Sequence, residues 1–371
     1  MTFPTLYIGL MSGTSLDAVD AVAVYFEKDN VNLIGGHSQP IPETLKNSIL
    51  ALSNGIDDNL QLLAATDRKL GKLYASTTLE LIKKYGLNAS QVAAIGCHGQ
   101  TVRHVPPGQE KTPFSLQIGD PNILSTDTGI SVVADFRRKD MALGGQGAPL
   151  VPAFHRQIFS SRDHNRVIVN IGGIANITYL PTKGECLGFD TGPGNMLMDL
   201  WSQDHLGQAY DQNGSWAASG SVNDKLLKQL KRCDFFSQPA PKSTGRELFN
   251  RSWLNIELAG YAELANEDIQ ATLLALSAQT ICEAINNLQS RVEEVYVCGG
   301  GASNSTLMSA IGVLLPQANV STTETLGIGP SWVEACAFAW LAKQRMENKT
   351  GNLTAVTGAS REAVLGALYH P

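Results

Sequence analysis

The sequence has little charge and no global excess of positive charge. Charged residues make up 17% of its 371 residues, below the roughly 25% of an average domain, while hydrophobic residues make up 43%. This composition excludes a disordered chain and indicates compact, well-buried domains. The formal net charge of -6 at pH 7 gives no overall field that would attract a polyanion, so we expect neither nucleic acid nor an anionic membrane as a partner.

The sequence also lacks cysteine pairs, a secretory signal and an unbroken membrane span. Its six cysteines form no CxxC pair and no zinc-spaced cluster, which predicts buried, reduced thiols. The N-terminus MTFPTLYIGLMSGTSLD has no basic start and no small-residue cleavage site. The uncharged stretch between Glu294 and Glu324 is interrupted by a Gly triplet and by Pro316. We therefore expect a cytoplasmic protein.

The two familiar phosphate-binding loops are absent, but glycine is abundant. There is no GxxxxGK[ST] and no GxGxxG after a strand, which excludes the Walker and Rossmann types of nucleotide site. The 35 glycines exceed the average share of about 7% and cluster in short turns, where backbone can approach a ligand closely.

Three of these turns follow short apolar runs of strand character. The first and second are hairpins, with strands at 6–10 and 21–26 and at 167–171 and 177–180, and the third is a strand-to-helix turn after 295–298. A further apolar run at 186–189 is followed by Asp190 and then by another Gly-rich turn. Backbone amides and hydroxyls in two such hairpins could hold phosphoryl oxygens from two sides, and the third turn could hold a nucleoside. The candidate nucleotide-binding residues are Gly13, Thr14, Ser15, Leu16, Asp17, Asp20, Gly172, Gly173, Gly192, Gly194, Asn195, Gly299, Gly300 and Gly301.

Strands alternate with helices in both halves of the chain. Apolar periodicity predicts helices over about 60–85, 268–288 and 332–345, and further strands at 92–97 and 130–134. Leu60, Leu70 and Tyr74 lie on the predicted core stripe of the first helix, and Gly86 should end it. The pattern predicts α/β domains: domain I over 1–130, with about 350–371 returning to it, and domain II over 131–349.

Several segments together resemble the anhydro-N-acetylmuramic acid kinase family. They are MSGTSLDAVD, AIGCHGQT, DFRRKDMALGGQGAPLVPAFH, NIGGIANIT, GFDTGPGN, QPAPKSTGRE, VCGGGASN and the terminal VTGAS, and they cover nearly the whole chain. One departure is Ala18, where the family's first motif is expected to carry glycine.

The resemblance implies a fold, a reaction and cofactors. The fold would be two actin-like, ribonuclease H-like domains with an interdomain cleft, as in the acetate and sugar kinase, chaperone ATPase and actin superfamily. The family uses ATP and Mg²⁺ to convert 1,6-anhydro-N-acetylmuramic acid and one water into N-acetylmuramic acid 6-phosphate, returning cell-wall amino sugar to metabolism. The resemblance further implies a homodimer.

Asp190 is the candidate catalytic base for that reaction. A glycosidase needs two carboxylates because one of them protonates the leaving oxygen. Here the leaving oxygen is O6, and if the γ-phosphoryl group captures O6 as the C1–O6 bond breaks, one base that deprotonates water suffices. The alternative role is local, because an Asp before Thr-Gly-Pro-Gly can equally close an Asx-turn.

The remaining candidates also have structural alternatives. Asp17, beside the first turn, is expected to hold Mg²⁺ directly or through water, and the alternative for it and for Asp20 is turn capping. Arg137 and Arg138 follow a strand, where a guanidinium could clamp a carboxylate or phosphoryl group, and the alternative for both is a surface ion pair with Asp135 or Asp140. Of the two, we expect Arg137 to bind the substrate.

Three further residues are candidates for the sugar pocket. The local sequence gives Glu334 a structural role in a capping box that begins at Ser331. The family resemblance instead implies that its carboxylate contacts the sugar. His98 and Gln100, after a predicted strand, could line the pocket, or His98 could satisfy a buried backbone group. The loop over 235–246 could be a lid.

Two other functions remain open on the sequence. A kinase for another sugar would use Asp190 to deprotonate a substrate hydroxyl instead of water. An ATP-gated binding module could share the fold, although 371 residues leave no room for an extra partner-binding domain.

Overall fold

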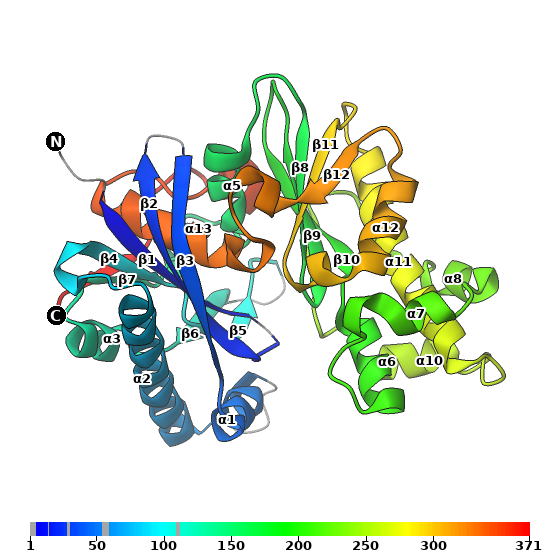
Figure 1. The fold of residues 1–371 in the computed structure, drawn as a ribbon, viewed down its shortest axis with the longest axis horizontal. Coiled ribbons are helices and arrows are strands. Elements are labelled where there is room, and N and C mark those ends of the chain that lie inside the picture. Colours follow the sequence, from blue (N-terminus) through cyan, green and yellow to red (C-terminus); the bar gives the residue numbers. More distant parts are fainter. Residues whose placement is uncertain (1–4, 14, 28–29, 54–58, 109–111) are drawn as a thin grey trace. The chain divides into compact units, whose positions relative to one another are not determined.

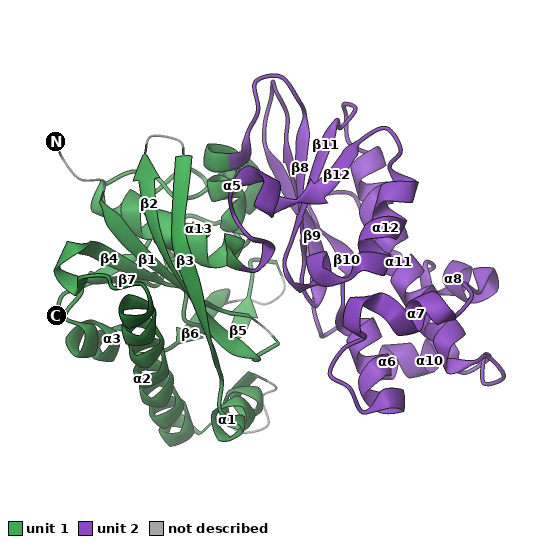
Figure 2. Cartoon of the chain, in the orientation of Figure 1, with its two compact units in different colours: residues 1–158, 332–371 green, residues 159–331 purple. Residues whose placement is uncertain are grey.

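The computed structural model describes residues 5–13, 15–27, 30–53, 59–108 and 112–371, and it divides into two compact units. Unit 1 contains residues 1–158 and 332–371, and unit 2 contains residues 159–331 (Figure 2). The sequence analysis placed the boundaries near 130 and 350. The structure differs because the short strand at 132–134 pairs within the first sheet, and because the helix at 333–346 packs on that same sheet.

Unit 1 is built on a six-stranded sheet with strand order β13-β7-β4-β1-β2-β3 (Figure 1). β1 to β3 are antiparallel neighbours, whereas β4 pairs parallel to β1 and β7 pairs parallel to β4. The sheet strands are β1 (Leu6–Ser12), β2 (Ala18–Glu27), β3 (Asn30–Pro40), β4 (Val92–Cys97), β7 (Val132–Ala134) and β13 (Ala367–Tyr369). The other elements are a hairpin of β5 (Gln100–Val105) and β6 (Phe114–Ile118), and the helices α1 (Glu43–Ser53), α2 (Leu60–Lys84), η1 (Ala89–Gln91), α3 (Pro121–Thr128), α4 (Arg137–Ala142), α5 (Val151–Phe159), α13 (Val333–Met346) and α14 (Thr354–Thr357).

Unit 2 repeats this topology. Its five-stranded sheet has the order β10-β9-β8-β11-β12, with the first three strands antiparallel in chain order and the last two parallel. Its strands are β8 (Arg166–Ile171), β9 (Ile174–Leu180), β10 (Leu187–Pro193), β11 (Glu294–Cys298) and β12 (Asn319–Thr322). Its helices are α6 (Met196–Leu206), η2 (Gln212–Gly214), α7 (Ser215–Ser219), α8 (Asp224–Leu230), α9 (Asp234–Ser237), α10 (Arg251–Leu258), α11 (Asn266–Asn286), η3 (Gly300–Ser303), α12 (Ser305–Leu314) and η4 (Thr323–Leu326), and η5 (Pro330–Trp332) spans the boundary. The repeated order confirms the predicted pair of ribonuclease H-like domains.

Alternation along β1 places helices on both faces of the first sheet. Leu6, Ile8 and Leu10 share one core with Leu70 and Tyr74 of α2. Successive side chains in a strand point to opposite faces, so Gly9 faces the other side, where α13 lies. A Cβ at Gly9 would stand only 1.8 Å from the Ala335 carbonyl oxygen, so glycine is what allows this helix to lie directly on the strand.

Most predicted elements are present, with one error in the core. The three turn-forming segments, the strands at 92–97 and 132–134, and the helices α2, α11 and α13 all occur near their predicted positions. Leu60, predicted as part of the core stripe of α2, is instead 79% exposed because it is the first residue of the helix. All six cysteines are free, and five of them are buried.

Among the described residues, every helix is either too short or too polar to cross a membrane.

Candidate functional site

A buried polar chain links β1, α2 and β5 within unit 1. The Ser12 hydroxyl lies 2.7 Å from the Tyr74 hydroxyl and donates to Oε1 of Gln100 at 2.8 Å. All three side chains are almost fully buried, and burial raises the pKa of Tyr74, which keeps its hydroxyl neutral. Gln100 is a predicted sugar-binding residue, but its amide oxygen already accepts the hydrogen bond from Ser12. This bond fixes the side chain at the start of β5.

His98 and Arg137 form the second feature of unit 1. Nε2 of His98 lies 3.2 Å from Nε and 2.8 Å from Nη2 of Arg137, and Nη1 of Arg137 donates to the Gly147 carbonyl at 2.8 Å. Burial, and then the charge of Arg137, lower the pKa of His98 well below its usual value, so its ring is neutral. Burial also lowers the pKa of Arg137, to about 10, which still leaves the guanidinium charged at neutral pH.

Glu334 and Asp20 bring two carboxyl groups to the same part of unit 1. Burial raises the pKa of Glu334; the charge of Arg137 opposes this increase, whereas that of Asp20 adds to it. Burial also raises the pKa of Asp20, against a hydrogen bond from Ser38. Arg137 thus lies in the electrostatic field of Glu334 while bonding to His98, so the structure brings three of the predicted substrate-binding residues together.

The capping box predicted for Glu334 is wrong. α13 begins at Val333, its N-cap is Trp332, and that cap makes no side-chain hydrogen bond. The preceding residues Pro330–Trp332 form a 3-10 turn, which moves Ser331 out of the N-cap position. Glu334 therefore lies in the first turn of α13 without the capping role.

The first Gly-rich turn connects β1 to β2. Leu16 has φ of 58° and a buried side chain, and its N–H donates to the Gly13 carbonyl at 3.2 Å, so neither group is free for a ligand. The Asp17 side chain is 73% exposed, and one carboxylate oxygen lies 3.5 Å from Nζ of Lys46. Gly13 and Ser15 flank Thr14, which is outside the described residues.

Arg138 takes the alternative role that the sequence left open for it. Its Nε lies 2.7 Å from Oδ1 of Asp135, and the side chain is 66% exposed. This is the surface ion pair, whereas the neighbouring Arg137 turns inward to His98.

Three Gly-rich turns meet at one edge of the unit 2 sheet. The N–H groups of Gly194 and Asn195 donate to the carbonyls of Gly173 and Gly172, each at 2.8 Å. A Cβ at Gly299 would lie 2.4 Å from Oδ1 of Asn170. These close approaches place the β8–β9 turn, the start of α6 and the turn after β11 side by side.

The glycines also show which amides remain for a ligand. The N–H groups of Gly172, Gly194, Asn195 and Gly299 are used within the protein. In the portion of the chain that the structure describes, the N–H of Gly173 makes no such bond.

Asp190 lies on β10 in unit 2, immediately before a register shift of the β9–β10 pair. Such a bulge re-aims a side chain and is common beside active sites. Oδ2 of Asp190 accepts hydrogen bonds from the Ser243 hydroxyl and the Thr244 N–H, both at 2.9 Å. Among the described residues nothing donates to Oδ1. The Asx-turn alternative is not observed, because the carboxylate bonds to a distant segment instead of to its own turn.

The environment of Asp190 raises the pKa of its carboxyl group. Burial raises the pKa of Asp190 to about 6, against the hydrogen bonds from Thr244 and Ser243 and with a contribution from Glu247. A carboxylate of this pKa is ionised at neutral pH and is a stronger base than an exposed aspartate.

The sequence missed the residues that hold Asp190. The predicted lid over 235–246 supplies them: besides Ser243 and Thr244, the Lys242 carbonyl accepts the Asp190 N–H at 3.0 Å. The Nζ of Lys242 donates to the Phe235 carbonyl at 2.9 Å, which closes the segment on itself. The only available signal was the Ser-Thr pair in QPAPKSTGRE, since more than 50 residues separate it from Asp190.

Comparison with known proteins identifies the family of this chain. The family model described as anhydro-N-acetylmuramic acid kinase matches residues 5–371. Proteins of that name from Shewanella sediminis and Shewanella pealeana are 54% and 52% identical over 364 residues, with 98% of each chain covered. A solved structure, the activator of the 2-hydroxyisocaproyl-CoA dehydratase from Clostridium difficile, is 13% identical at a TM-score of 0.46 and covers 93% of this chain and 98% of its own. The match over nearly the whole length places the chain in the anhydro-N-acetylmuramic acid kinase family.

Proposed function

We propose that this protein is a kinase that uses ATP to open 1,6-anhydro-N-acetylmuramic acid with one water and to phosphorylate O6. The products are N-acetylmuramic acid 6-phosphate and ADP. Membership of the family supports the substrate and the reaction. The observation that carries the mechanism is Asp190, with Oδ2 held by two donors, Oδ1 unoccupied and a pKa of about 6.

In this mechanism Asp190 is the general base. Its Oδ1 takes a proton from the water as the water oxygen bonds to C1 of the sugar. The C1–O6 electron pair goes to O6, and O6 bonds to the γ-phosphorus of ATP as the bond from that phosphorus to the departing ADP oxygen breaks. O6 therefore needs no protonation. Ser243 and Thr244 fix the carboxylate during this step, since both bond to the other oxygen.

The unit 1 cluster is assigned to the sugar. The Arg137 guanidinium has five N–H groups, of which three bond to His98 and Gly147, so two remain for a carboxylate such as that of the lactyl group. Glu334 and His98 are assigned to the sugar's polar groups.

The Gly-rich turns are assigned to the nucleotide. The N–H of Gly173 is the donor best placed for a phosphoryl oxygen, and the close contacts of Gly299 and Gly301 shape the turn for the nucleoside.

The residues present fit Mg²⁺. This ion is commonly held by one or two carboxylates together with water and substrate phosphates. Asp17, with its exposed carboxylate beside the first turn, would hold it directly or through water and so neutralise phosphate charge. We further propose that the protein is cytoplasmic and that it forms a homodimer. Light scattering of the purified chain would test the oligomeric state.

Mass spectrometry tests the proposed function. The anhydro sugar is incubated with the protein and Mg-ATP in ¹⁸O-labelled water, with a reaction lacking ATP as the control. A product heavier by one water and one phosphoryl group, with ¹⁸O at C1, is expected. Addition of a phosphoryl group without ¹⁸O would indicate an ordinary hydroxyl kinase, and unchanged sugar would contradict the proposal.

A further inference from the structure

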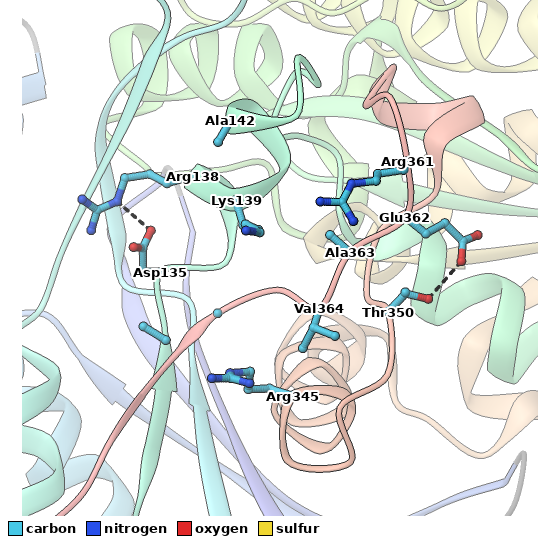
Figure 3. Close-up of a pocket in the computed structure, with 12 residues that line it drawn as sticks. Asp135, Arg138, Lys139, Ala142, Arg345, Thr350, Arg361, Glu362, Ala363 and Val364 are labelled. Carbon is cyan, nitrogen blue, oxygen red and sulfur yellow. Dashed lines mark hydrogen bonds and ion pairs between the residues drawn. The ribbon is translucent and has the colours of Figure 1, made fainter.

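A pocket lies entirely within unit 1, between α4 and the C-terminal segment. It has a volume of about 680 Å³ and is open to solvent. Its wall is formed by the start of α4, the end of α13 and residues 350–367 (Figure 3). None of the proposed catalytic, sugar-binding or nucleotide-binding residues lines it.

The charged groups of this pocket are unequal in number. Four cations line it, namely Arg138, Lys139, Arg345 and Arg361, against only two carboxylates. Both carboxylates are engaged at the rim: that of Asp135 with Arg138, and that of Glu362 with the Thr350 hydroxyl at 2.9 Å.

The three other cations lack an acidic partner. Among the described residues, Lys139, Arg345 and Arg361 form no ion pair. Figure 3 shows Lys139 and Arg361 extending from opposite walls toward the middle of the pocket, while Glu362 turns away toward Thr350. An excess of unpaired positive charge therefore faces the open space.

Arg345 adds an independent observation. Its Nε is buried and has no hydrogen-bond partner in the part of the chain that the structure describes. A buried N–H without an acceptor is unfavourable, and native proteins rarely leave one unsatisfied. Arg345 therefore adds to the pocket wall a positive charge that no carboxylate among the described residues neutralises.

We propose that this pocket binds a small anion that carries a phosphate group. Guanidinium groups match the geometry of phosphate oxygens and pair with them through two parallel hydrogen bonds, and lysine adds a point charge. The volume lies within the range of pockets that hold small organic ligands, so a phosphomonoester of a small metabolite fits better than free phosphate.

The pocket and the proposed sugar cluster share one helix. α4 begins with Arg137, which bonds to His98, and its next two residues line the pocket. The test must therefore separate binding here from binding at the catalytic residues.

Isothermal titration calorimetry on the full chain, saturated with Mg-ADP, provides that test. The probes are glucose 6-phosphate and inorganic phosphate, with glucose as the uncharged control. The variants are Lys139→Gln and Arg361→Gln, whose side chains are exposed, and Lys83→Gln, at an exposed position of α2, is the control matched in charge change.

We expect a phosphate probe to bind and glucose not to bind. Each pocket variant should weaken binding about tenfold or more, since each removes a charge-assisted contact, while Lys83→Gln leaves it unchanged. Tighter binding of glucose 6-phosphate assigns an ester, and equal binding assigns free phosphate. No binding of either phosphate probe, or equal binding by the pocket variants and wild type, would overturn the proposal. Because the readout needs no turnover, it is independent of the proposed function.

Discussion

Arg137 donates two hydrogen bonds to a single atom of His98, the Nε2, from its Nε at 3.2 Å and its Nη2 at 2.8 Å. Arginine can only donate, so Nε2 must be the unprotonated acceptor and the ring proton must lie on Nδ1. That Nδ1 is buried, and a backbone hydrogen bond with Gly99 also acts on the ring. The contact with Arg137 therefore fixes the tautomer of His98.

The tautomer of His98 is the first prediction. Because burial and Arg137 both disfavour the imidazolium, the ring should remain neutral, with its proton on Nδ1, throughout pH 5–8. Long-range ¹H–¹⁵N correlation spectra would show this, with the exposed His164 as a reference signal. In Arg137→Met the restraint on the tautomer is removed, so the Nε2–H form should appear. A His98 signal that titrates near pH 6.5 in the wild type would contradict the assignment.

Asp190→Asn should separate binding from chemistry. The amide keeps the shape and can still accept from Ser243 and Thr244, but it cannot take a proton from water. We expect turnover to fall by ~10²-fold or more with little change in the affinity for either ligand. Rapid-quench kinetics together with calorimetric binding would measure both quantities, and near-normal turnover would sink the assignment of the base.

The same substitution should stabilise the fold. The folded-state pKa of about 6 lies above the unfolded value. The folded state is therefore most stable at low pH, where Asp190 is protonated, and it loses stability as pH rises from the unfolded pKa through 6. At pH 7.5 the neutral amide removes that cost, worth up to about 3 kcal/mol. Melting curves at pH 5 and 7.5 should show a larger gain in Tm at the higher pH, because only about half of the cost is present at pH 5, where the unfolded aspartate is ionised and the folded one is still protonated.

The pH dependence of the rate supplies a third prediction. If Asp190 must be ionised, kcat/KM should rise with pH and reach half of its plateau near pH 6. The Ser243 hydrogen bond lowers the pKa of Asp190, so Ser243→Ala should move this midpoint upward. Ser237→Ala is a suitable control, because its hydroxyl bonds only to the Asp234 carbonyl. A midpoint that stays in place in Ser243→Ala would show that another group titrates.

The sequence revealed the fold more completely than it revealed the site. Strand character, Gly-rich turns and helical periodicity are local signals, and most strands of the two sheets follow from them, whereas β3, β12 and β13 were not predicted. The boundary near 130 failed because β7 has only three residues and owes its place to pairing with β4 and β13. Such long-range pairing leaves little trace in the local pattern.

Candidate residues could be found, but their partners could not. Asp190 was marked by its position after an apolar run, whereas Ser243 and Thr244 lie far along the chain and meet it only in the fold. The local sequence matched a capping box at Ser331, but the 3-10 turn before α13 places Trp332 at the N-cap position instead. Local propensity is commonly overridden in this way by tertiary context.

Glu334→Gln provides a fourth prediction. Since burial raises the pKa of Glu334, its carboxylate destabilises the fold as pH rises through that pKa, and glutamine should raise the Tm at pH 7.5. If the carboxylate contacts the sugar, the affinity for the sugar should fall about tenfold or more. Glu347→Gln, at the exposed C-terminal end of the same helix, is the control: it loses surface ion pairs with Lys343 and Lys349, so it should lower stability by about 1 kcal/mol or less and leave sugar affinity unchanged. Unchanged sugar affinity in Glu334→Gln would remove this carboxylate from the sugar-binding residues.

Gly9→Ala tests whether the close packing of α13 on β1 requires glycine at position 9. The added methyl would lie 1.8 Å from the Ala335 carbonyl oxygen and 2.9 Å from the Ala339 backbone nitrogen, and backbone atoms cannot rotate away as a side chain can. The helix must therefore shift, which we expect to cost about 3 kcal/mol or more and to raise KM for the sugar, because Glu334 is in the first turn of that helix. Gly312→Ala is the matched control: it lies within α12 with nothing near its Cβ, so alanine should stabilise the protein by about 0.5–1 kcal/mol. Urea unfolding of both variants measures the difference, and equal stability would mean that the contact of β1 with α13 adapts without glycine.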